Sequence, residues 1–234
     1  MTRLIFLCYI SKMSNLTLHN YFRSSTSYRV RIALEAKSLK YNYIPVHLIN
    51  NGGEQNAQNY RTLNPAGGVP TLVHNEKVIS QSFAIIEYLD EVFPESAALF
   101  PKDAFERSKI RQVCEVINSD IHPLSNLKVT HFLEKEFKIT ADQKSQWQNK
   151  WITEGLSAVE KTLAPYSGKF CFGDTMSAAD LFLIPQLFSS LRFGVDISVY
   201  KQLSAINDNC LALEAFKKAH PLRQIDTPED IRIN

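Results

Sequence analysis

A string of hydroxyl side chains stands where a strand-like segment passes into a helix-like one. Residues 22–29 read Phe-Arg-Ser-Ser-Thr-Ser-Tyr-Arg, and the helix is expected to start inside this string. The first amides of a helix have no intrahelical partners and its dipole is positive at that end, so Ser24, Ser25 and Thr26 would lie where an anion is stabilised. If the anion is a thiolate, its pKa falls below about 8.5. This segment holds no cysteine, so the thiol would belong to a ligand. The alternative is that Ser25 or Thr26 only caps the helix.

Two later pairs of residues would contact the same ligand. Val69 and Pro70 precede an expected strand, and a cis bond there would present the Val69 N–H and C=O to an extended peptide. The alternative is a trans proline, which is the commoner form. Gln81 and Ser82 stand where a strand ends and a helix begins. Ser82 as the N-cap would leave free amides for a carboxylate, and Gln81 would hold an ammonium or amide, although simple capping alone explains the pair.

The elements that position these residues follow from the apolar periodicity. Alternation predicts a strand over 16–21, and helical spacing predicts a helix over 27–37. The strand-like segment 43–48 contains Pro45, which confines it to a sheet edge. Two further strands, 71–74 and 78–79, form a hairpin, and Ser82 opens a helix with one apolar face: Ile85, Ile86, Leu89 and Val92. A β-α-β unit followed by β-β-α indicates a small α/β sheet of thioredoxin type.

The second half of the chain is expected to be all-helical. Ser177 and Asp180 match a capping box in front of an apolar run, which is a structural signal. Helices are predicted over 103–134, 141–164, 177–192 and 203–219. The predicted organisation is a thioredoxin-like domain (14–95), a linker (96–101) and an all-helical domain (102–234). Residues 1–13 are interpreted as an appendage or a mis-called start, because Met13 offers an alternative start.

The composition excludes several classes of protein. Hydrophobic residues make up 44% and charged residues 21% of the 234 residues, which is ordinary globular usage. The net charge of +2, without a basic cluster, does not favour nucleic acid, and the apolar run 4–10 is shorter than the roughly 20 residues that span a bilayer. The four cysteines lie far apart without a metal-ligand spacing. We therefore expect reduced thiols, no metal site, no membrane partner and a cytoplasmic location.

Taken in order, these motifs resemble the zeta class of glutathione transferases, the maleylacetoacetate isomerases. The resemblance covers nearly the whole chain from Leu16. It is carried by residues 24–34, 63–65, 69–72, 81–82 and 84–89 and, in the helical half, by Pro123, Leu124, Asn126, 172–174, 179–181, 185–186, 192–193, 195–196, Pro221 and 226–228.

The resemblance implies a fold, a reaction and a set of site residues. The fold is that of cytosolic glutathione transferases, usually homodimers, with glutathione as cofactor. The reaction is cis–trans isomerisation of maleylacetoacetate to fumarylacetoacetate in tyrosine and phenylalanine catabolism, with transferase activity toward other electrophiles at the side. Ser24 matches the leading hydroxyl that activates the thiolate, with Ser25 beside it as a second catalytic residue, and Arg192 matches a carboxylate anchor for a dicarboxylate substrate. The implied glutathione-binding residues are Ser24, Ser25, Thr26, Gln55, Val69, Gln81, Ser82, His122 and Asn126.

Two departures from the animal members leave the substrate open. Thr26 replaces a cysteine and His122 replaces a glutamine, and related maleylpyruvate isomerases carry the same two residues, so maleylpyruvate is the alternative substrate. A third hypothesis is a non-catalytic module with a transferase fold, against which the intact serine and Gln-Ser pairs argue. His122 either polarises a substrate oxygen or is a capping or core histidine. Arg23 and Arg29 are further candidates for carboxylate binding, and a surface ion pair is the alternative for Arg29.

Overall fold

The computed structural model of the protein describes residues 15–233, so the interpretation of residues 1–13 lies outside the described part. Its sheet has four strands in the order β2-β1-β3-β4: β1 (Leu16–Asn20), β2 (Asn42–Pro45), β3 (Thr71–His74) and β4 (Lys77–Ser80). β1 pairs parallel with β2 and antiparallel with β3, and β3 and β4 form an antiparallel hairpin. β2 lies at the sheet edge, as Pro45 predicts.

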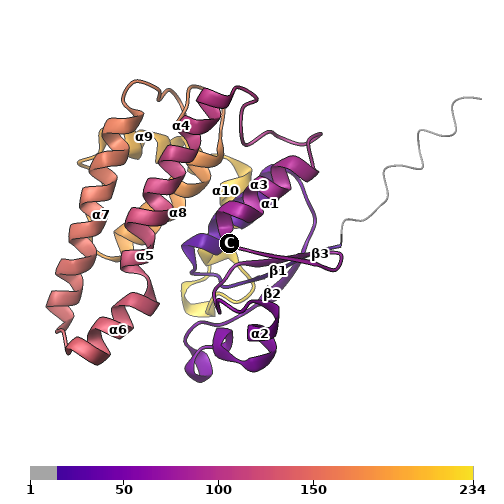
Figure 1. The fold of residues 1–234 in the computed structure, drawn as a ribbon. Coiled ribbons are helices and arrows are strands. Elements are labelled where there is room, and N and C mark those ends of the chain that lie inside the picture. Colours follow the sequence, from indigo (N-terminus) through magenta and orange to yellow (C-terminus); the bar gives the residue numbers. More distant parts are fainter. Residues whose placement is uncertain (1–14, 234) are drawn as a thin grey trace, which may run out of the picture.

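Two helices cover one side of the sheet, α1 (Ser25–Ala36) and α3 (Ser82–Val92), and a short helix α2 (Gln58–Leu63) lies on the other (Figure 1). Leu16 and Leu18 alternate with partly exposed neighbours along β1 and are buried, because successive strand residues face opposite sides. Together with Leu72 of β3 they pack in the core with the apolar face of α1. This arrangement is the predicted thioredoxin-like α/β fold.

The apolar face predicted for α3 is only partly right. Ile85, Ile86 and Leu89 are buried, but Val92 is 42% exposed, because it lies at the end of the helix where the core no longer covers it. α2 was not expected from the polar sequence around it, which contains two further short 3₁₀ turns.

The regular elements after α3 are all helices, apart from one isolated β-bridge between Ser167 and Gly173. The elements are α4 (Ala104–Glu115), a π-helical turn η3 (Val116–Ile121), α5 (His122–Ser125), α6 (Leu127–Phe137), α7 (Ala141–Leu163), α8 (Ala178–Arg192), α9 (Lys201–Leu211) and α10 (Glu214–Ala219), followed by two 3₁₀ turns. The helices predicted over 141–164 and 177–192 are confirmed. Those predicted over 103–134 and 203–219 are each divided, the first by η3 and the break at Asn126, the second after Leu211.

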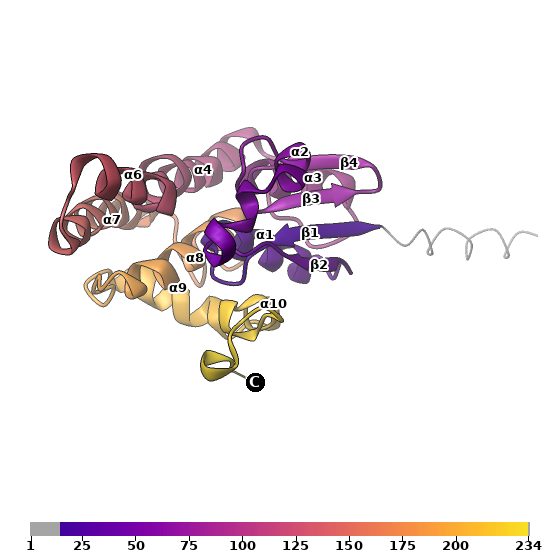
Figure 2. The same cartoon turned by 90° about the horizontal axis from the view of Figure 1, so that it is seen from below.

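The two halves meet along α1. This helix packs on α3 from its own half and on α8 and α10 from the helical half. Figure 2 shows α8 beside α1, with α9 and α10 on one side of the molecule and α3, α4 and β4 on the other. Within residues 15–233, no helix is both long and apolar enough to cross a membrane. The N-terminal end of α1, where the hydroxyl string lies, is therefore bordered by both halves.

Candidate active site

Ser24 caps α1. Its backbone is extended, and its hydroxyl oxygen accepts a hydrogen bond of 3.2 Å from the Ser27 N–H. The N–H groups of Ser25 and Thr26 have no hydrogen-bond acceptor among residues 15–233. Free amides at the positive end of a twelve-residue helix favour an anion. The hydroxyl string therefore has the geometry that its sequence predicts, and the helix begins two residues before the predicted range.

Thr26 connects this helix end to the cis bond before Pro70. The Val69–Pro70 bond is cis, the form that would expose the Val69 backbone to a ligand, although trans is the commoner form. The Thr26 hydroxyl donates to the Val69 C=O at 2.9 Å, so this carbonyl is occupied by the protein itself. The Val69 N–H has no partner among the described residues and remains available to a ligand.

The Ser82 hydroxyl is held from behind by a buried arginine. The N-cap of α3 is Gln81, not Ser82 as predicted. The backbone φ of Gln81 is 73°, a positive value that residues other than glycine rarely adopt. Ser82 is the first helical residue, and its Oγ accepts from Arg29 Nη1 at 3.2 Å. The same Nη1 donates to Asn118 of η3 at 2.8 Å.

Arg29 is fully buried, so the alternative of a surface ion pair is wrong. Its guanidinium lies 4.2 Å from the Phe182 ring centroid, and its Nε and Nη2 have no partner among the described residues. No acidic side chain in the described part forms a salt bridge with it. Burial lowers the pKa of Arg29 to about 9, which leaves it cationic at pH 7. The site therefore has a buried positive charge behind Ser82 that is not part of a salt bridge within residues 15–233.

His122 links the helical half to Ser25. Its Nδ1 lies 3.2 Å from Ser25 Oγ, and its Nε2 lies 3.4 Å from Asn126 Nδ2. Burial, and then the charge of Arg29, lowers the pKa of His122 to about 3. The residue is half-buried, and protein atoms surround its ring. With this lowered pKa, the imidazole is neutral at pH 7. Both ring nitrogens have protein partners, which leaves none free to polarise a substrate oxygen.

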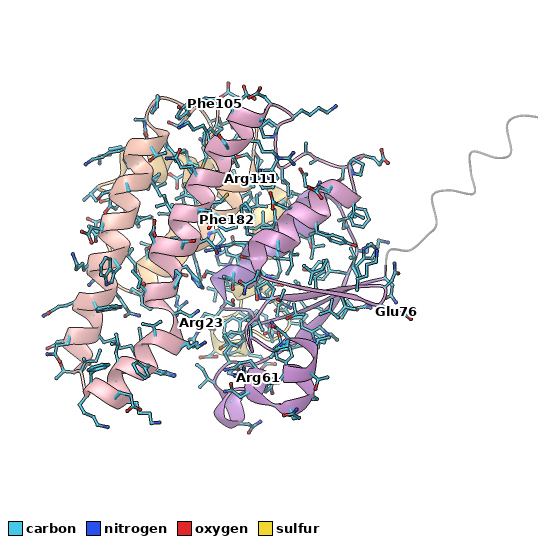
Figure 3. The ribbon with its side chains drawn as sticks, in the orientation of Figure 1. Arg23, Arg61, Glu76, Phe105, Arg111 and Phe182 are labelled. Carbon is cyan, nitrogen blue, oxygen red and sulfur yellow. The ribbon has the colours of Figure 1, made fainter. Side chains whose placement is uncertain are left out.

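Arg23 and Arg192 form a second positive cluster beside the serines. Burial lowers the pKa of Arg192, and the positive charge of Arg23 lowers it further, so the two guanidinium groups interact unfavourably. Neither forms a salt bridge with an acidic residue among those described. Arg23 lies where the sheet half faces the helical half (Figure 3). Two unpaired guanidinium groups at one place bind carboxylates well.

The turn that carries Arg23 and Ser24 is held by two residues, Arg31 and Asp226, for which no local motif predicts this role. Arg31 is fully buried and donates to the carbonyls of Tyr21 and Phe22 at 3.3 and 2.9 Å. Asp226, from the C-terminal segment, accepts from the Phe22 N–H at 2.9 Å. Both belong to the segments that carry the family resemblance, which is the one sequence signal for them. Asn118, which holds Arg29, lies in no such segment.

Among the described residues, the side chains of Gln81, Arg192 and Gln55 form no hydrogen bond with the other predicted site residues. Gln55 lies in a 3₁₀ turn (Glu54–Asn56), where its Nε2 donates to Leu48 O at 3.4 Å and its buried Oε1 has no partner in the described part. Ser177 and Asp180 have the structural role predicted for them. The Asp180 carboxylate accepts from the N–H groups of Ser177 and Cys171 at 2.8 and 2.9 Å.

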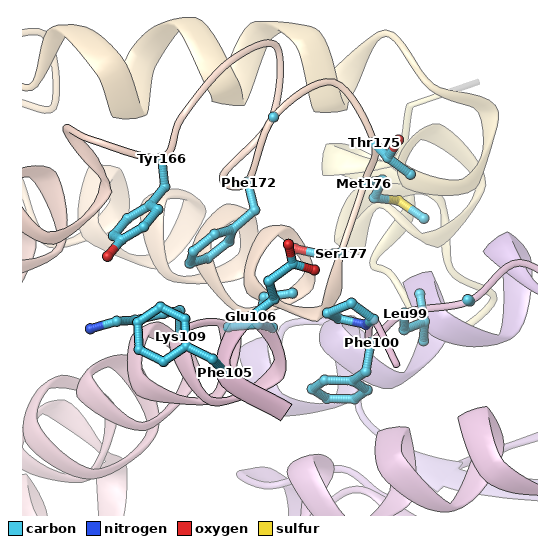
Figure 4. A pocket seen from close by; sticks show the side chains of 14 residues that line it. Leu99, Phe100, Phe105, Glu106, Lys109, Tyr166, Phe172, Thr175, Met176 and Ser177 are labelled. Atoms are coloured by element: carbon cyan, nitrogen blue, oxygen red, sulfur yellow. The ribbon is translucent and has the colours of Figure 1, made fainter. Parts of the chain in front are cut away.

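A separate pocket of about 460 Å³ lies in the helical half (Figure 4). Its walls include Phe100, Phe105, Lys109, Tyr166, Phe172 and Met176, and none of the predicted site residues. The predicted catalytic and binding side chains lie elsewhere, so this pocket is not the candidate active site. Among residues 15–233, no group of three His, Cys, Asp or Glu side chains has the arrangement of a metal site.

Comparisons with known proteins identify relatives of this chain. The family model described as "Glutathione S-transferase, N-terminal domain" matches residues 14–91. The maleylacetoacetate isomerase of Mus musculus is 44% identical over 215 residues, which are 92% of this chain and 96% of that protein. A solved holo structure of a bacterial zeta-class maleyl pyruvate isomerase covers 91% of this chain and 100% of its own, with 38% identity and a TM-score of 0.87. A maleylacetoacetate isomerase from Anaeromyxobacter dehalogenans, solved with GSH in its active site, has 36% identity and a TM-score of 0.82 over 92% and 98% of the two chains.

The thioredoxin-like sheet, the helical second half and the anion site at the start of α1 define a glutathione transferase fold. Identity above 40% over nearly the full length of curated relatives narrows the assignment further. The chain belongs to the maleylacetoacetate isomerase family, the zeta class of the glutathione transferases.

Proposed function

We propose that this protein is a glutathione-dependent isomerase that converts maleylacetoacetate to fumarylacetoacetate. The observation that carries the proposal is the position of two anion sites side by side. Ser24 and Ser25 lie at the positive end of α1, and the adjacent Arg23 lies close to Arg192, with neither guanidinium group in a salt bridge within residues 15–233. One site suits a thiolate and the other suits the carboxylates of a dianionic substrate.

The residues present fit glutathione. The free N–H groups of Ser25 and Thr26 would face its thiolate, the free Val69 N–H would pair with its peptide backbone, and the start of α3 at Ser82 would hold a carboxylate. Arg29, two of whose nitrogens have no partner among the described residues, adds a positive charge that forms no salt bridge there. We also assign Thr26, Gln55, Gln81, His122 and Asn126 to this site, of which Gln55 has the least structural support.

When bound, glutathione supplies a thiolate that adds reversibly to an activated double bond and so permits its rotation. The task of the protein is to keep the thiol ionised, to hold the substrate carboxylates and to stabilise the negative charge that develops on the substrate. The serine hydroxyls and the amides of α1 serve the first requirement. Arg192 with Arg23 serves the second, and the nearby guanidinium charge favours the third.

Several finer statements belong to the same proposal. The reaction places the protein in tyrosine and phenylalanine catabolism, and glutathione conjugation of other electrophiles is a side activity of such a site. We propose a cytoplasmic homodimer. The cytoplasmic location is supported by Cys114, Cys171 and Cys210, which are buried free thiols. Maleylpyruvate is the second candidate substrate, favoured by Thr26 and His122, which replace a cysteine and a glutamine.

The test is turnover of maleylacetoacetate and maleylpyruvate side by side, with and without glutathione. We expect isomerisation of maleylacetoacetate that requires glutathione and does not consume it. Faster turnover of maleylpyruvate would move the assignment to the second substrate. Retention on immobilised glutathione without isomerisation of either acid would support a non-catalytic module instead. The matched control is the Ser24→Ala/Ser25→Ala double variant, which should lose the activity.

A further inference from the structure

Arg29 keeps a positive charge inside the protein without a carboxylate in contact with it. Its side chain is fully buried, its Nε and Nη2 have no partner among the described residues, and it forms no salt bridge there. Glu115 acts on it only from a distance, because this exposed carboxylate accepts a hydrogen bond of 2.7 Å from the Ser119 hydroxyl instead. A buried ion normally has a counter-charge, which here is not supplied within residues 15–233.

Asn118 of η3 occupies the position where a counter-charge would fit. A guanidinium nitrogen can only donate, so Asn118 Oδ1 is the acceptor of the bond of 2.8 Å from Arg29 Nη1. Aspartate has nearly the same shape as asparagine, and in this position its carboxylate would form a charge-assisted hydrogen bond and neutralise the guanidinium. The neutral amide of Asn118 satisfies the donor and leaves the charge of Arg29 in place.

The same guanidinium nitrogen contacts Ser82. Arg29 Nη1 donates to Ser82 Oγ at 3.2 Å, so this oxygen is an acceptor and the Ser82 hydroxyl proton remains for another group. Ser82 is also the first residue of the eleven-residue helix α3, whose N-terminal end is positive. A carboxylate at Ser82 would therefore meet a hydroxyl proton and, behind the hydroxyl, the charge of Arg29.

The γ-glutamyl end of glutathione has the matching chemistry. It carries a carboxylate and an ammonium on one carbon atom, and Gln81 offers an amide beside Ser82. The glycyl end carries a carboxylate alone. The pair of Gln81 and Ser82 therefore suits the γ-glutamyl end, and the carboxylate of that end is the group that would lie in front of Arg29.

We propose that Arg29 is the internal counter-charge for the γ-glutamyl carboxylate of glutathione, and that Asn118 determines the affinity for this carboxylate because its neutral amide leaves the charge to the ligand. Arg29 acts through Ser82 and does not touch the ligand, so both are positioning residues. The identity of the ligand rests on the proposed function. Because Asn118 lies in η3, 89 positions after Arg29, the helical half contributes to binding of this end of glutathione.

Two ligands isolate the carboxylate. S-methylglutathione has no thiol, so its affinity does not depend on ionisation at the start of α1. The second ligand, 4-aminobutyryl-S-methylcysteinylglycine, differs from it only in lacking the γ-glutamyl carboxylate. Isothermal titration calorimetry at pH 7 measures both dissociation constants. The wild type should bind S-methylglutathione more tightly, and the ratio of the two constants reports the contribution of the carboxylate.

The deciding pair of variants is Asn118→Asp and Asn118→Ala. Asn118→Asp keeps the acceptor and neutralises Arg29, so it should weaken S-methylglutathione by about 5- to 50-fold, without weakening the second ligand and without lowering Tm. Asn118→Ala removes the acceptor and keeps the charge, so Tm should fall while the ratio of the two constants changes by less than about 3-fold. If Asn118 only held the fold, Asn118→Asp would preserve the ratio, and this outcome would overturn the proposal.

Gln112→Glu is the matched control for the added charge. It makes the same change from amide to carboxylate at an exposed position of α4, where Gln112 accepts from Lys109 at 3.2 Å. Both dissociation constants should stay within about 2-fold of the wild type, since exposed charges are screened. A loss equal to that of Asn118→Asp would show a general effect of net charge and refute the role of Arg29.

Arg29→Met removes the charge itself at similar side-chain volume and should lower the ratio as Asn118→Asp does. If Arg29→Met does not fold, the two Asn118 variants still decide. A wild type that binds both ligands equally well would contradict the counter-charge and leave the proposed function intact. A wild type that binds neither S-methylglutathione nor glutathione would reject the proposed function, and the role of Arg29 with it.

Discussion

At the scale of single residues, the four arginines around the site have two different roles. Arg29 and Arg31 are fully buried and hold other groups in place, Ser82 and Asn118 in one case and the turn before Ser24 in the other. Arg23 and Arg192 retain solvent contact and have no acidic partner in the described part. The buried pair builds the site, and the accessible pair is available to a ligand.

Arg192 separates an isomerase from a generic thiol-conjugating enzyme. A maleyl keto acid carries two carboxylates, and a partly desolvated guanidinium–carboxylate pair contributes on the order of 2–4 kcal/mol. Arg192→Ala should therefore lower kcat/KM for the maleyl substrate by about 30- to 1000-fold. Conjugation of a neutral electrophile in the same preparation should change little, because the thiolate site lies at α1. Steady-state kinetics with both substrates makes the measurement.

The matched control for Arg192 is Arg232, a partly exposed arginine that donates to the carbonyls of Ile225 and Thr227. Arg232→Ala should leave the ratio of the two activities unchanged. Equal losses of both reactions in Arg192→Ala would show a structural role for this residue. Loss of neither reaction would transfer the carboxylate anchor to Arg23.

The lowered pKa of His122 predicts that the stability of the folded protein depends on pH. Its folded-state pKa is lowered to about 3 by burial and then by Arg29, whereas the unfolded value is 6.5. Between these values the unfolded chain binds more protons, so the free energy of unfolding falls as the pH drops through this window. His122→Gln lacks the group. The stability of the wild type relative to this variant should thus decrease below pH 6.5 and stay constant above pH 7, as measured by urea unfolding. A difference that does not change with pH would mean an unshifted histidine.

The sequence predicted the residues that touch one another at the start of α1, because capping signals are local and obey fixed spacing. It did not predict how they are connected. The position of Arg29 in the helical pattern does not distinguish it from an exposed arginine. Its burial against Phe182 follows only from the packing of α8 on α1. The contact between Asn118 and Arg29 spans 89 positions of the chain, and no local pattern records it.

At the scale of elements, the π-helical turn η3 decides where the helical half contacts α1. A π turn inserts extra residues into a helix and changes which side chains face a neighbour. Asn118 lies within this turn and His122 follows it, and both point to α1, to Arg29 and Ser25. Simple helical periodicity predicted an unbroken helix over 103–134, because the apolar positions of α4, η3 and α6 follow one another without a loop-forming stretch. The site therefore depends on an irregularity that the periodicity does not encode.

Gly155 of α7 allows the end of η3 to pack closely against α7. A Cβ built on Gly155 would overlap the Ile121 side chain at the end of η3, and Ile121 is fully buried. Gly155→Ala should lower the free energy of unfolding by about 1–2 kcal/mol, since overpacking outweighs the gain in helix propensity. His122 Nδ1 lies 3.2 Å from Ser25 Oγ, so a displacement of His122 should disturb the proposed thiolate site and also raise the pKa of bound glutathione. Chemical denaturation and thiolate absorbance measure the two effects.

The companion variant for Gly155→Ala is Ile121→Ala, which removes the overlapping atoms. The double variant should be more stable than the sum of the two single effects predicts, by about 1 kcal/mol or more. Strict additivity would show that the two residues do not press on each other. In that case, the position of η3 would depend on other contacts.

At the scale of the whole molecule, the site belongs to neither half alone. The serines and Arg23 come from the β1–α1 segment, whereas His122, Asn126 and Arg192 come from the helical half. The halves are joined by buried polar contacts as well as apolar ones, such as the bond of 3.0 Å from Arg31 Nε to the Ala219 carbonyl of α10. Because α1 is shared, a change in its packing on α8 or α10 alters the thiolate site directly.

The face that carries β4, α3 and α4 supports the proposed homodimer. Figure 2 shows these elements along one side of the molecule. Val78 of β4, Val92 of α3 and Phe105 of α4 are 45%, 42% and 64% exposed, and β4 is an edge strand. A two-fold interface would bury each side chain twice. Val92 belongs to the apolar face predicted for α3 and is exposed in one chain, so such an interface would cover it.

Phe105→Ser tests this assembly. Burial of a Phe side chain contributes about 1.5–3 kcal/mol, and symmetry doubles the effect, so the dimer dissociation constant should rise by about 10²- to 10⁴-fold. Ile225 is the matched control, since it is 66% exposed and lies in the C-terminal segment on the opposite side (Figure 2). Light scattering at micromolar concentration should find a dimer for the wild type and Ile225→Ser, and a larger monomer fraction for Phe105→Ser. A monomeric wild type would disprove the homodimer. A dimer that Phe105→Ser leaves intact would place the interface on another face.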